Sequence, residues 1–438
     1  MYDCGCDDCK NQSAPVNLSL GDSFKQLLNI GSKAFKRLHE IGSYKPQDLK
    51  NEKVYQDLIT KTYDVFNFAI ADNVMPDIMR TALQSDAFLF GGLKTHAQLF
   101  EASKRLLDDN GNLKPFNQLS NEFDKLNVTY NKNYLEAEYE FAVGSSQMAA
   151  KWSEFSDNDR YYLQYRTAGD TRVRQEHAAL NGTTLPKNDP FWSSYTPPNG
   201  WNCRCTVVEV LKDKYPLSDS DKSSTAGEKA TTQIGKDGKN RLEIFRFNPG
   251  ADKKVFPPKH PLFANRCTGD GKLSITGLIG APLTILSAEK SKCEASKIIE
   301  EIRKENIRKA RKSKDIELNG WAIQNIKKNS HLSILGNQFK TSEVRVSRAN
   351  IAYILKHIGN VDNKNIVKDI VKITLQATYK DSKPLTDKGS KNYGTKVGRG
   401  VESYNYYNSN WEGRAIVINM EVMKNGYEQP YTILFDKK

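Results

Sequence analysis

Apolar residues recur at helical spacing through the first third of the chain. Between Leu20 and Ile41 they return every three or four positions, which leaves one apolar face and predicts an amphipathic helix. The same spacing predicts further helices over about residues 47–71, 95–107, 115–126 and 131–152. We therefore expect a helical N-terminal region, of a kind that suits docking on another protein.

The period of the pattern changes near residue 157. The sequence YYLQYR predicts a strand within residues 157–167, and CRCTVVEV predicts a second strand over 203–210. Prolines and glycines between these segments argue against a long helix or strand there. Residues 217–240 are rich in Ser, Thr, Gly, Lys and Asp, have little to bury and predict a flexible loop. The pattern favours a loop-rich α+β domain in the middle of the chain.

A connector and a basic helix are expected next. Residues 268–282 are rich in glycine and predict a connector, because the Gly-Lys-Ser/Thr ending of a phosphate-binding loop is missing. Residues 287–314 predict an amphipathic helix that carries many lysines and arginines. Such a helix could lie on nucleic acid phosphates or could be a solvated helix between domains, and the sequence leaves both interpretations open.

The C-terminal part mixes helices and strands. Val344–Val346 is strand-like, Ser347 is a good N-cap for a short helix, and a second helix is predicted near 366–373. Glycine- and tyrosine-rich loops are expected after these helices. A hairpin closes the chain, with alternating strands on either side of a type I′ turn at Asn425-Gly426.

Together these elements predict a multidomain α+β protein. It has a helical N-terminal region, a loop-rich α+β central domain, and a small C-terminal α+β domain with helices followed by an antiparallel sheet. The expected segments are a docking region at 1–130, the central domain at 131–267, the connector with the basic helix at 268–317, and the C-terminal domain at 318–438.

Composition narrows the class of partner. Hydrophobic residues make up 38% and charged residues 27% of the 438 residues, which is typical of a polar globular protein. The formal net charge of +13 favours an anionic partner, nucleic acid first, although a solvated basic surface would give the same balance. No apolar run reaches the roughly 18 residues that a membrane span needs, so no membrane partner is expected. The N-terminus does not resemble a signal peptide, which favours synthesis in a cytosol.

The densest special chemistry lies between residues 165 and 208. His177, Cys203 and Cys205 could bind structural zinc if the intervening loop folds back, with Asp170 or another carboxylate as the fourth ligand. The competing interpretation has no metal, and arginine–carboxylate pairs hold the loop instead. A nucleophilic Cys203 activated by His177 is a third reading.

This segment resembles the Mu F-type minor head protein (head-morphogenesis) family of tailed phages. The resemblance covers about residues 130–265 and includes DTRVRQEH, LNG, DPFW and PPNGWNCRC. Its motif residues are Arg166, Asp170, Arg172, Arg174, His177, Trp201, Cys203, Arg204 and Cys205. The resemblance implies a virion component, made in the bacterial host cytoplasm, whose partners are phage portal and capsid proteins and virion DNA. It implies no catalysis by this segment.

The C-terminal domain carries residue types that metal-free RNA cleavage uses: a base, cations and stacking aromatics. Around residues 354–358 (ILKHI), and in the closing hairpin, it is similar to phage-encoded nucleases of the barnase–EndoU–colicin–RelE superfamily. The resemblance implies a cyclising, metal-independent ribonuclease toxin that acts on RNA in a target-cell cytoplasm, with a cognate immunity protein as a further partner. We assign candidate roles to an acid/base, two charge stabilisers, a stacking residue or proton relay and a phosphate ligand: His357, Lys372 and Arg414, Tyr406, and Thr432.

An alternative remains for the C-terminal domain. It could bind nucleic acid or a capsid partner without catalysis, and its basic residues would then serve contact only. A transferase effector is a weaker option, because the sequence offers no recognisable nicotinamide pocket.

Overall fold

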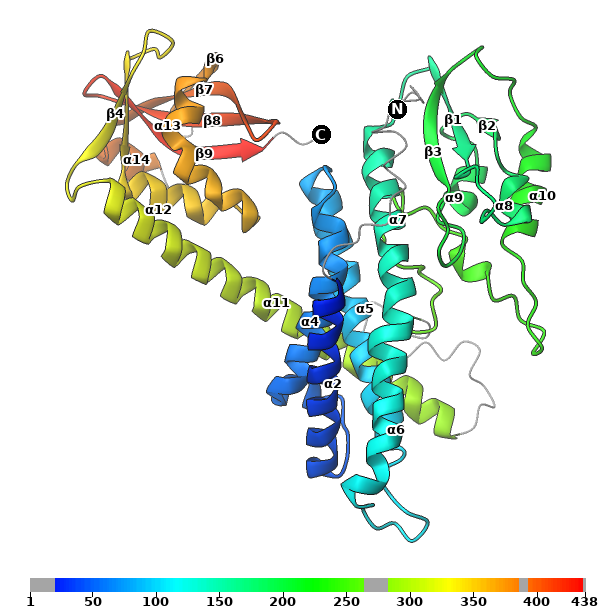
Figure 1. The fold of residues 1–438 in the computed structure, drawn as a ribbon. Coiled ribbons are helices and arrows are strands. Elements are labelled where there is room, and N and C mark those ends of the chain that lie inside the picture. The colour runs from blue at the N-terminus through cyan, green and yellow to red at the C-terminus, as the bar shows by residue number, and fades with distance from the viewer. Residues whose placement is uncertain (1–19, 264–282, 386–392, 436–438) are drawn as a thin grey trace. The chain divides into compact units, whose positions relative to one another are not determined.

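A computed structural model describes residues 20–263, 283–385 and 393–435 of the chain (Figure 1). The chain divides into two compact units, Met1–Arg303 and Lys304–Lys438, which we call the first and the second unit. The predicted class, mixed α+β with a helical N-terminal region and a C-terminal sheet, is confirmed. The cysteine-rich start of the chain, with Cys4, Cys6 and Cys9, and the predicted glycine-rich connector lie outside the described residues.

Helices build the N-terminal part of the first unit. They are α2 (Leu20–Ile41), α3 (Asp48–Asn51), α4 (Lys53–Ala71), α5 (Asp77–Ser103), α6 (Phe116–Val128), the π-helical η1 (Thr129–Asn133) and α7 (Tyr134–Glu154). The α4 helix contacts α2, α5 and α7, and one hydrophobic core runs between them. The amphipathic pattern predicts this bundle because the apolar stripe of each helix has to be buried against its neighbours.

The α5 helix is longer than the pattern predicts. It begins at Asp77, directly after Pro76, whereas the expected helix starts at Thr95. The added turns contain Gly91 and Gly92, which are poor helix formers. A Cβ on Gly92 would lie 2.5 Å from the side chain of Ile299, so the glycine lets the helix approach that side chain closely. Tertiary packing therefore outweighs local propensity here.

A small sheet organises the central part of the first unit. Its order is β2-β1-β3, both pairs are antiparallel, and Leu163, Tyr165, Trp192 and Val207 lie in its core. The elements of this part are β1 (Tyr161–Arg166), α8 (Gln175–Ala178), β2 (Thr184–Leu185), α9 (Phe191–Tyr195), β3 (Thr206–Leu211), α10 (Ser220–Ala230) and the 3₁₀ helix η2 (Glu243–Phe245). The two predicted strands are β1 and β3.

Residues 217–240 differ from the predicted flexible loop, because they contain helix α10. The Asp219 side chain caps this helix by accepting a hydrogen bond from the Lys222 backbone N–H at 2.8 Å. Gly227 lies against the ring of Tyr195, where a Cβ would come within 2.5 Å of ring carbon. The helix thus packs through small residues. Its sequence therefore has no apolar stripe from which a helix could be predicted.

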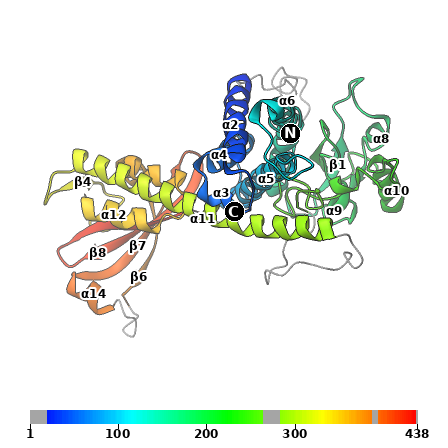
Figure 2. The same ribbon diagram turned by 90° about the horizontal axis from the view of Figure 1, so that it is seen from below.

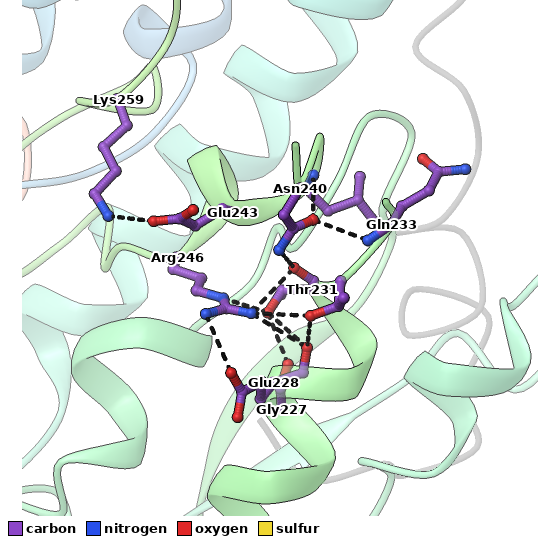
Figure 3. A network of polar contacts seen from close by, with 10 residues as sticks. Gly227, Glu228, Thr231, Gln233, Asn240, Glu243, Arg246 and Lys259 are labelled. Carbon is purple, nitrogen blue, oxygen red and sulfur yellow. Dashed lines mark hydrogen bonds and ion pairs between the residues drawn. The ribbon is translucent and has the colours of Figure 1, made fainter. Parts of the chain in front are cut away.

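A polar network fixes the C-terminal end of α10 (Figure 3). Arg246 donates to the Thr231 hydroxyl at 2.9 Å, and Asn240 donates to the Thr231 carbonyl at 2.8 Å. The Lys259 ammonium lies 2.8 Å from a Glu243 carboxylate oxygen. These contacts give residues 231–259 definite positions although they contain little regular structure.

The second unit is built on a six-stranded sheet of order β4-β5-β9-β8-β7-β6. All neighbours are antiparallel except β5 and β9, which are parallel. Helix α12 packs against the sheet (Figures 1 and 2). The elements are α11 (Leu283–Asn325, which begins in the first unit), β4 (His331–Leu335), β5 (Glu343–Ser347), α12 (Arg348–His357), the 3₁₀ helix η3 (Asp362–Asp369), α13 (Ile370–Leu375), β6 (Thr378–Pro384), α14 (Tyr393–Gly398), β7 (Val401–Trp411), β8 (Arg414–Met423) and β9 (Tyr427–Phe435).

Strands β6 and β7 occupy part of the predicted glycine- and tyrosine-rich loops. Asn and Ser are poor strand formers, which explains the loop prediction for β7. However, Tyr407 and Trp411 are buried on the core face with Ile418, while Tyr404 is buried with Val401 in a separate cluster. Aromatic burial on both faces therefore outweighs the polar residues between. The predicted hairpin is present as β8 and β9, but the predicted type I′ turn is wrong. Met423 pairs with Tyr427, so the loop has three residues, and only Gly426 (φ +79°), not Asn425, has a positive φ.

Candidate functional site

Two clusters of chemistry-bearing side chains stand out, one in each unit. The first comprises His177, Cys203 and Cys205 and is called here the His–Cys cluster. Strand β1 pairs with β3 so that Arg166 lies opposite Thr206. The chain that leaves β1 and the chain that enters β3 therefore meet at one end of the sheet. This pairing brings together residues that are 26 and 28 positions apart.

The three potential ligand atoms of the His–Cys cluster lie within 4.8 Å of one another. Nδ1 of His177 is 3.6 Å from the Cys203 sulfur and 3.8 Å from the Cys205 sulfur. The histidine is 2% exposed, and its Nε2 has no hydrogen-bond partner among the described residues. Both cysteines are free thiols of intermediate exposure. The sequence-predicted metal ligands are thus assembled.

The two thiols polarise one another. A hydrogen bond with Cys205, together with the nearby His177, holds the pKa of Cys203 well below its usual range. The pKa of Cys205 is raised, because Cys203 and burial both disfavour a second negative charge. The pair therefore gives up its first proton more readily than its second. It can serve as a metal ligand set or as an activated thiol.

Charged motif residues brace the loop that carries the cysteines. Arg204 donates to both carboxylate oxygens of Asp170, at 2.6 and 2.7 Å, and holds the pKa of that carboxyl well below its usual range. Arg172 makes a weaker contact with Asp170 at 3.4 Å. The arginine–carboxylate pairing predicted from the sequence is therefore present, but it is exposed rather than buried.

The remaining motif residues have structural contacts. Arg174 donates to the backbone carbonyl of Trp201 at 2.6 Å, and Arg166 donates to the Gln164 side chain at 3.0 Å. The Trp201 ring packs edge-on against Phe141 at 5.2 Å between ring centroids. These contacts tie the motif to helix α7 and to strand β1.

The second cluster lies in the second unit and centres on His357, the last residue of α12. We call it the His–Tyr cluster; its other members are Tyr353, Tyr431 and Lys396. The ring of His357 stacks on Tyr353 at 4.2 Å, and Tyr353 stacks on Tyr431 at 4.7 Å between centroids. The hydroxyls of Tyr353 and Tyr431 share a hydrogen bond of 2.6 Å. His357 itself is exposed.

The hydrogen bond of His357 to a backbone carbonyl shows which ring nitrogen carries the proton. Nδ1 lies 2.8 Å from the carbonyl oxygen of Tyr353, and a carbonyl can only accept, so Nδ1 carries the proton. Neutral His357 therefore has an unprotonated Nε2, which is the form a general base requires. The Lys396 ammonium lies 5.1 Å from the Tyr431 ring centroid and 4.8 Å from that of Tyr404. A base, a positive charge and aromatic faces thus occur together.

Some sequence-predicted residues lie near this cluster and others do not. Tyr406 and Thr432 are both paired with Asn419 in the sheet register, so the three side chains form one cross-strand row beside Tyr431. Arg414 pairs with Trp411. That position is seven residues along β7 from Tyr404, about 23 Å at roughly 3.3 Å per residue. Arg414 instead donates to Asn363.

Lys372 also lies apart from His357. It is an exposed residue of α13, and no contact between it and His357 is found in the described part of the chain. Sequence reasoning missed Tyr353, Tyr431 and Lys396. Tyr353 could have been found, because it precedes His357 by four residues on the same helix face. Only the fold of the sheet brings Tyr431 near the histidine and Lys396 near Tyr431.

Part of the first unit is similar to known phage proteins. Residues 110–208 match the family described as Phage Mu protein F like protein. The chain is 50% identical over 46 residues to the "Putative capsid assembly protein F" of Escherichia phage Mu, a match that covers 10% of each chain. It is 37% identical over 67 residues to the "Mu-like prophage FluMu F protein" of Haemophilus influenzae, covering 15% of this chain and 16% of the relative. No solved structure matches the chain.

Proposed function

We propose that this protein is a minor head protein that acts in the assembly of a phage or prophage head. The observation that carries the proposal is the match over residues 110–208, which runs from α6 into β3 and contains every member of the His–Cys cluster. The similar protein of phage Mu is described as a capsid assembly protein. The matched part is a small share of each chain, so the role of the whole protein rests on this proposal.

The proposal places the protein in the virion, bound to portal or capsid proteins. The helical part of the first unit supplies a docking surface, and the positive net charge of +13 suits packaged DNA. The described residues contain no helix that is long and apolar enough to cross a membrane. Synthesis in the host cytoplasm and incorporation during head assembly follow from this role.

The assembly role is tested in the phage or prophage that encodes the chain. Purified virions should contain its peptides by mass spectrometry, and deletion of the gene should lower the yield of mature heads in electron micrographs. Wild-type protein and the His357→Gln variant should both restore heads, because His357 lies outside the matched region. Virions without these peptides, together with an unchanged head yield after deletion, would contradict the proposal.

A second candidate function concerns the second unit, which we propose cleaves RNA without a metal ion. The His–Tyr cluster supports it. Nε2 of His357 takes the proton of a 2′-hydroxyl, the 2′-oxygen attacks phosphorus, and the P–O5′ bond breaks. The products are a 2′,3′-cyclic phosphate and a 5′-hydroxyl, whose oxygen takes up a proton from the hydroxyl pair of Tyr353 and Tyr431.

Charge and stacking support RNA as the substrate. Lys396 can stabilise the charge that develops on the phosphorane, a role that the sequence assigned to Lys372 and Arg414. Tyr406 offers a face for an unpaired base, and Thr432 in the same row can donate to a phosphate. A toxin of this kind would act in a target-cell cytoplasm, and a cognate immunity protein would cover the His–Tyr cluster.

The ribonuclease proposal is tested with the full chain on tRNA and ribosomal RNA in buffer without divalent ions. Cleavage should leave 2′,3′-cyclic ends and should fall 10²- to 10⁴-fold in His357→Gln, the usual range for loss of a general base (about 10²–10⁴). Arg414→Gln is the matched control and should keep activity, because Arg414 pairs with Trp411, seven residues along β7 from Tyr404, and donates to Asn363. A folded wild-type chain that cuts neither RNA would leave the non-catalytic alternative, in which the domain only binds nucleic acid or a capsid partner.

A further inference from the structure

We propose that His177, Cys203 and Cys205 bind one zinc ion through Nδ1 and two sulfurs, with a water molecule as the fourth ligand. The site would join α8 to the chain that enters β3. It concerns the first unit alone, and it stands or falls independently of the assembly and ribonuclease proposals.

The separation of the ligand atoms fits a shared ion. Zinc–sulfur bonds are about 2.3 Å and zinc–nitrogen bonds about 2.0–2.1 Å, so a tetrahedral angle places nitrogen and sulfur about 3.6 Å apart. The distances from His177 Nδ1 are 3.6 Å to Cys203 and 3.8 Å to Cys205. An ion could therefore bind without a large movement of any of the three side chains.

The surroundings of His177 point to a cation as well. One imidazole nitrogen has one hydrogen-bonding direction, yet Nδ1 faces two sulfurs at similar distances. The two sulfurs are the only partners of Nδ1 among the described residues, although the side chain is 2% exposed. Buried polar groups without good partners are rare and call for an explanation. A bound zinc ion gives Nδ1 a strong partner and neutralises the charge of two thiolates.

The fourth position does not fall to Asp170, the carboxylate that the sequence offered. Both oxygens of Asp170 are held by Arg204, and no fourth His, Cys, Asp or Glu joins the group in the described part of the chain. Both cysteines are partly exposed, which leaves access for a water molecule. Asp170 and Arg204 instead position the backbone on which the two cysteines lie.

A zinc ion would solve a folding problem of this segment. Between β1 and β3 the chain has only short elements and few ladder hydrogen bonds. A clip that joins residues 26 and 28 positions apart restricts the unfolded chain and links metal binding to folding. In this proposal the Cys-x-Cys pair, Cys203 and Cys205, supplies two ligands of one ion.

The test measures metal in the full chain after expression with added zinc. Elemental analysis should give one zinc per chain in the wild type and in Cys4→Ser/Cys6→Ser/Cys9→Ser, the control for the other clustered cysteines. The ion should be lost from Cys203→Ser/Cys205→Ser and from His177→Gln. Zinc that is absent from the wild type, or lost only with Cys4, Cys6 and Cys9, would overturn the proposal.

A second measurement uses only chains with an intact cluster, in case the variants fail to fold. Cobalt bound to the Cys4→Ser/Cys6→Ser/Cys9→Ser chain should show a thiolate-to-metal charge-transfer band and the visible absorption of tetrahedral coordination. Zinc should protect Cys203 and Cys205 from alkylation, read by peptide mass spectrometry, and a chelator should remove the protection. A cobalt spectrum without thiolate bands, or alkylation that zinc does not change, would overturn the proposal.

Discussion

The two histidine clusters use the same side chain in opposite settings. His177 is buried, and its Nδ1 faces two sulfurs. His357 is exposed at the end of a helix, and its Nδ1 donates to the carbonyl of Tyr353, so that in the neutral ring Nε2 carries no proton. Two sulfurs lie beside the first histidine, whereas the rings of Tyr353 and Tyr431 lie beside the second.

This difference separates a site that holds the fold from one that can meet a ligand. A buried imidazole with all its neighbours in place cannot reach a substrate, so its contacts contribute to the stability of the fold. An exposed imidazole contributes little to stability and is free to act on what binds. The comparison therefore predicts that substitutions in the two clusters affect different measurements.

The largest expected contrast is in stability. His177→Ala should lower the free energy of unfolding by about 3 kcal/mol or more, as truncation of a buried ring does, while His357→Ala should change it by less than about 0.5 kcal/mol. Urea titration measures the change. Hydrogen exchange read by mass spectrometry should show faster exchange in β1 and β3 for His177→Ala only. Equal losses for the two variants would break the comparison.

The next effect concerns the RNA binding that we propose for the His–Tyr cluster. Lys396→Met removes the positive charge beside Tyr404 and Tyr431. We expect about tenfold weaker binding of a single-stranded RNA, about 1.4 kcal/mol, and a fall of about 1 in the slope of log affinity against log salt concentration. Fluorescence anisotropy at several salt concentrations measures both. Lys372→Met is the control, because this exposed lysine lies outside the cluster, and an equal loss there would point to unspecific charge.

The sequence predicts several helices of this protein well because their apolar stripes are local, although it misses the first half of α5. The first unit shows this in α2 and α6, and the second in α12 with its Ser347 cap. Strand β7 and helix α10 are not predicted from the sequence, and the reason is the same for both. Their burial depends on partners far along the chain, such as Ile418 for Tyr407 and Tyr195 for Gly227.

The two candidate sites also differ in how far the sequence predicts them. His177, Cys203 and Cys205 can be predicted as a group, because their types are unusual and a short antiparallel sheet joins them. Apart from Tyr353, which precedes His357 by four residues on the same helix, the group around His357 cannot be predicted, since any lysine, arginine or tyrosine of a basic, tyrosine-rich domain is an equal candidate by type. Only the register of β7, β8 and β9 shows which of them come near, and it selects Tyr406 and Thr432 while it sets Arg414 apart.

A smaller effect tests the tyrosine pair. Tyr431→Phe removes the hydrogen bond with the Tyr353 hydroxyl, so the second unit should lose about 1 kcal/mol of stability, the usual net value of such a bond. Tyr406→Phe is the matched control, because no hydrogen bond of its hydroxyl is found among the described residues. Urea titration should therefore distinguish the two variants. If both behave alike, the hydroxyl pair adds nothing to the ordering of the His–Tyr cluster.

The smallest effect concerns the exposed pair that braces the His–Cys cluster. Because Arg204 keeps the pKa of Asp170 well below its usual range, the unfolded chain takes up this proton at a higher pH than the folded chain does. The pair therefore stabilises the fold fully above the unfolded pKa of about 3.9, and the contribution is lost as the pH falls through the folded pKa. Asp170→Asn should lower the urea midpoint slightly and equally at pH 7 and 5, and the difference from wild type should shrink below about pH 4. Zinc content should not change, because Asp170 is not a ligand in our proposal. A loss of zinc in this variant would make Asp170 part of the metal site and would return the fourth position to a carboxylate.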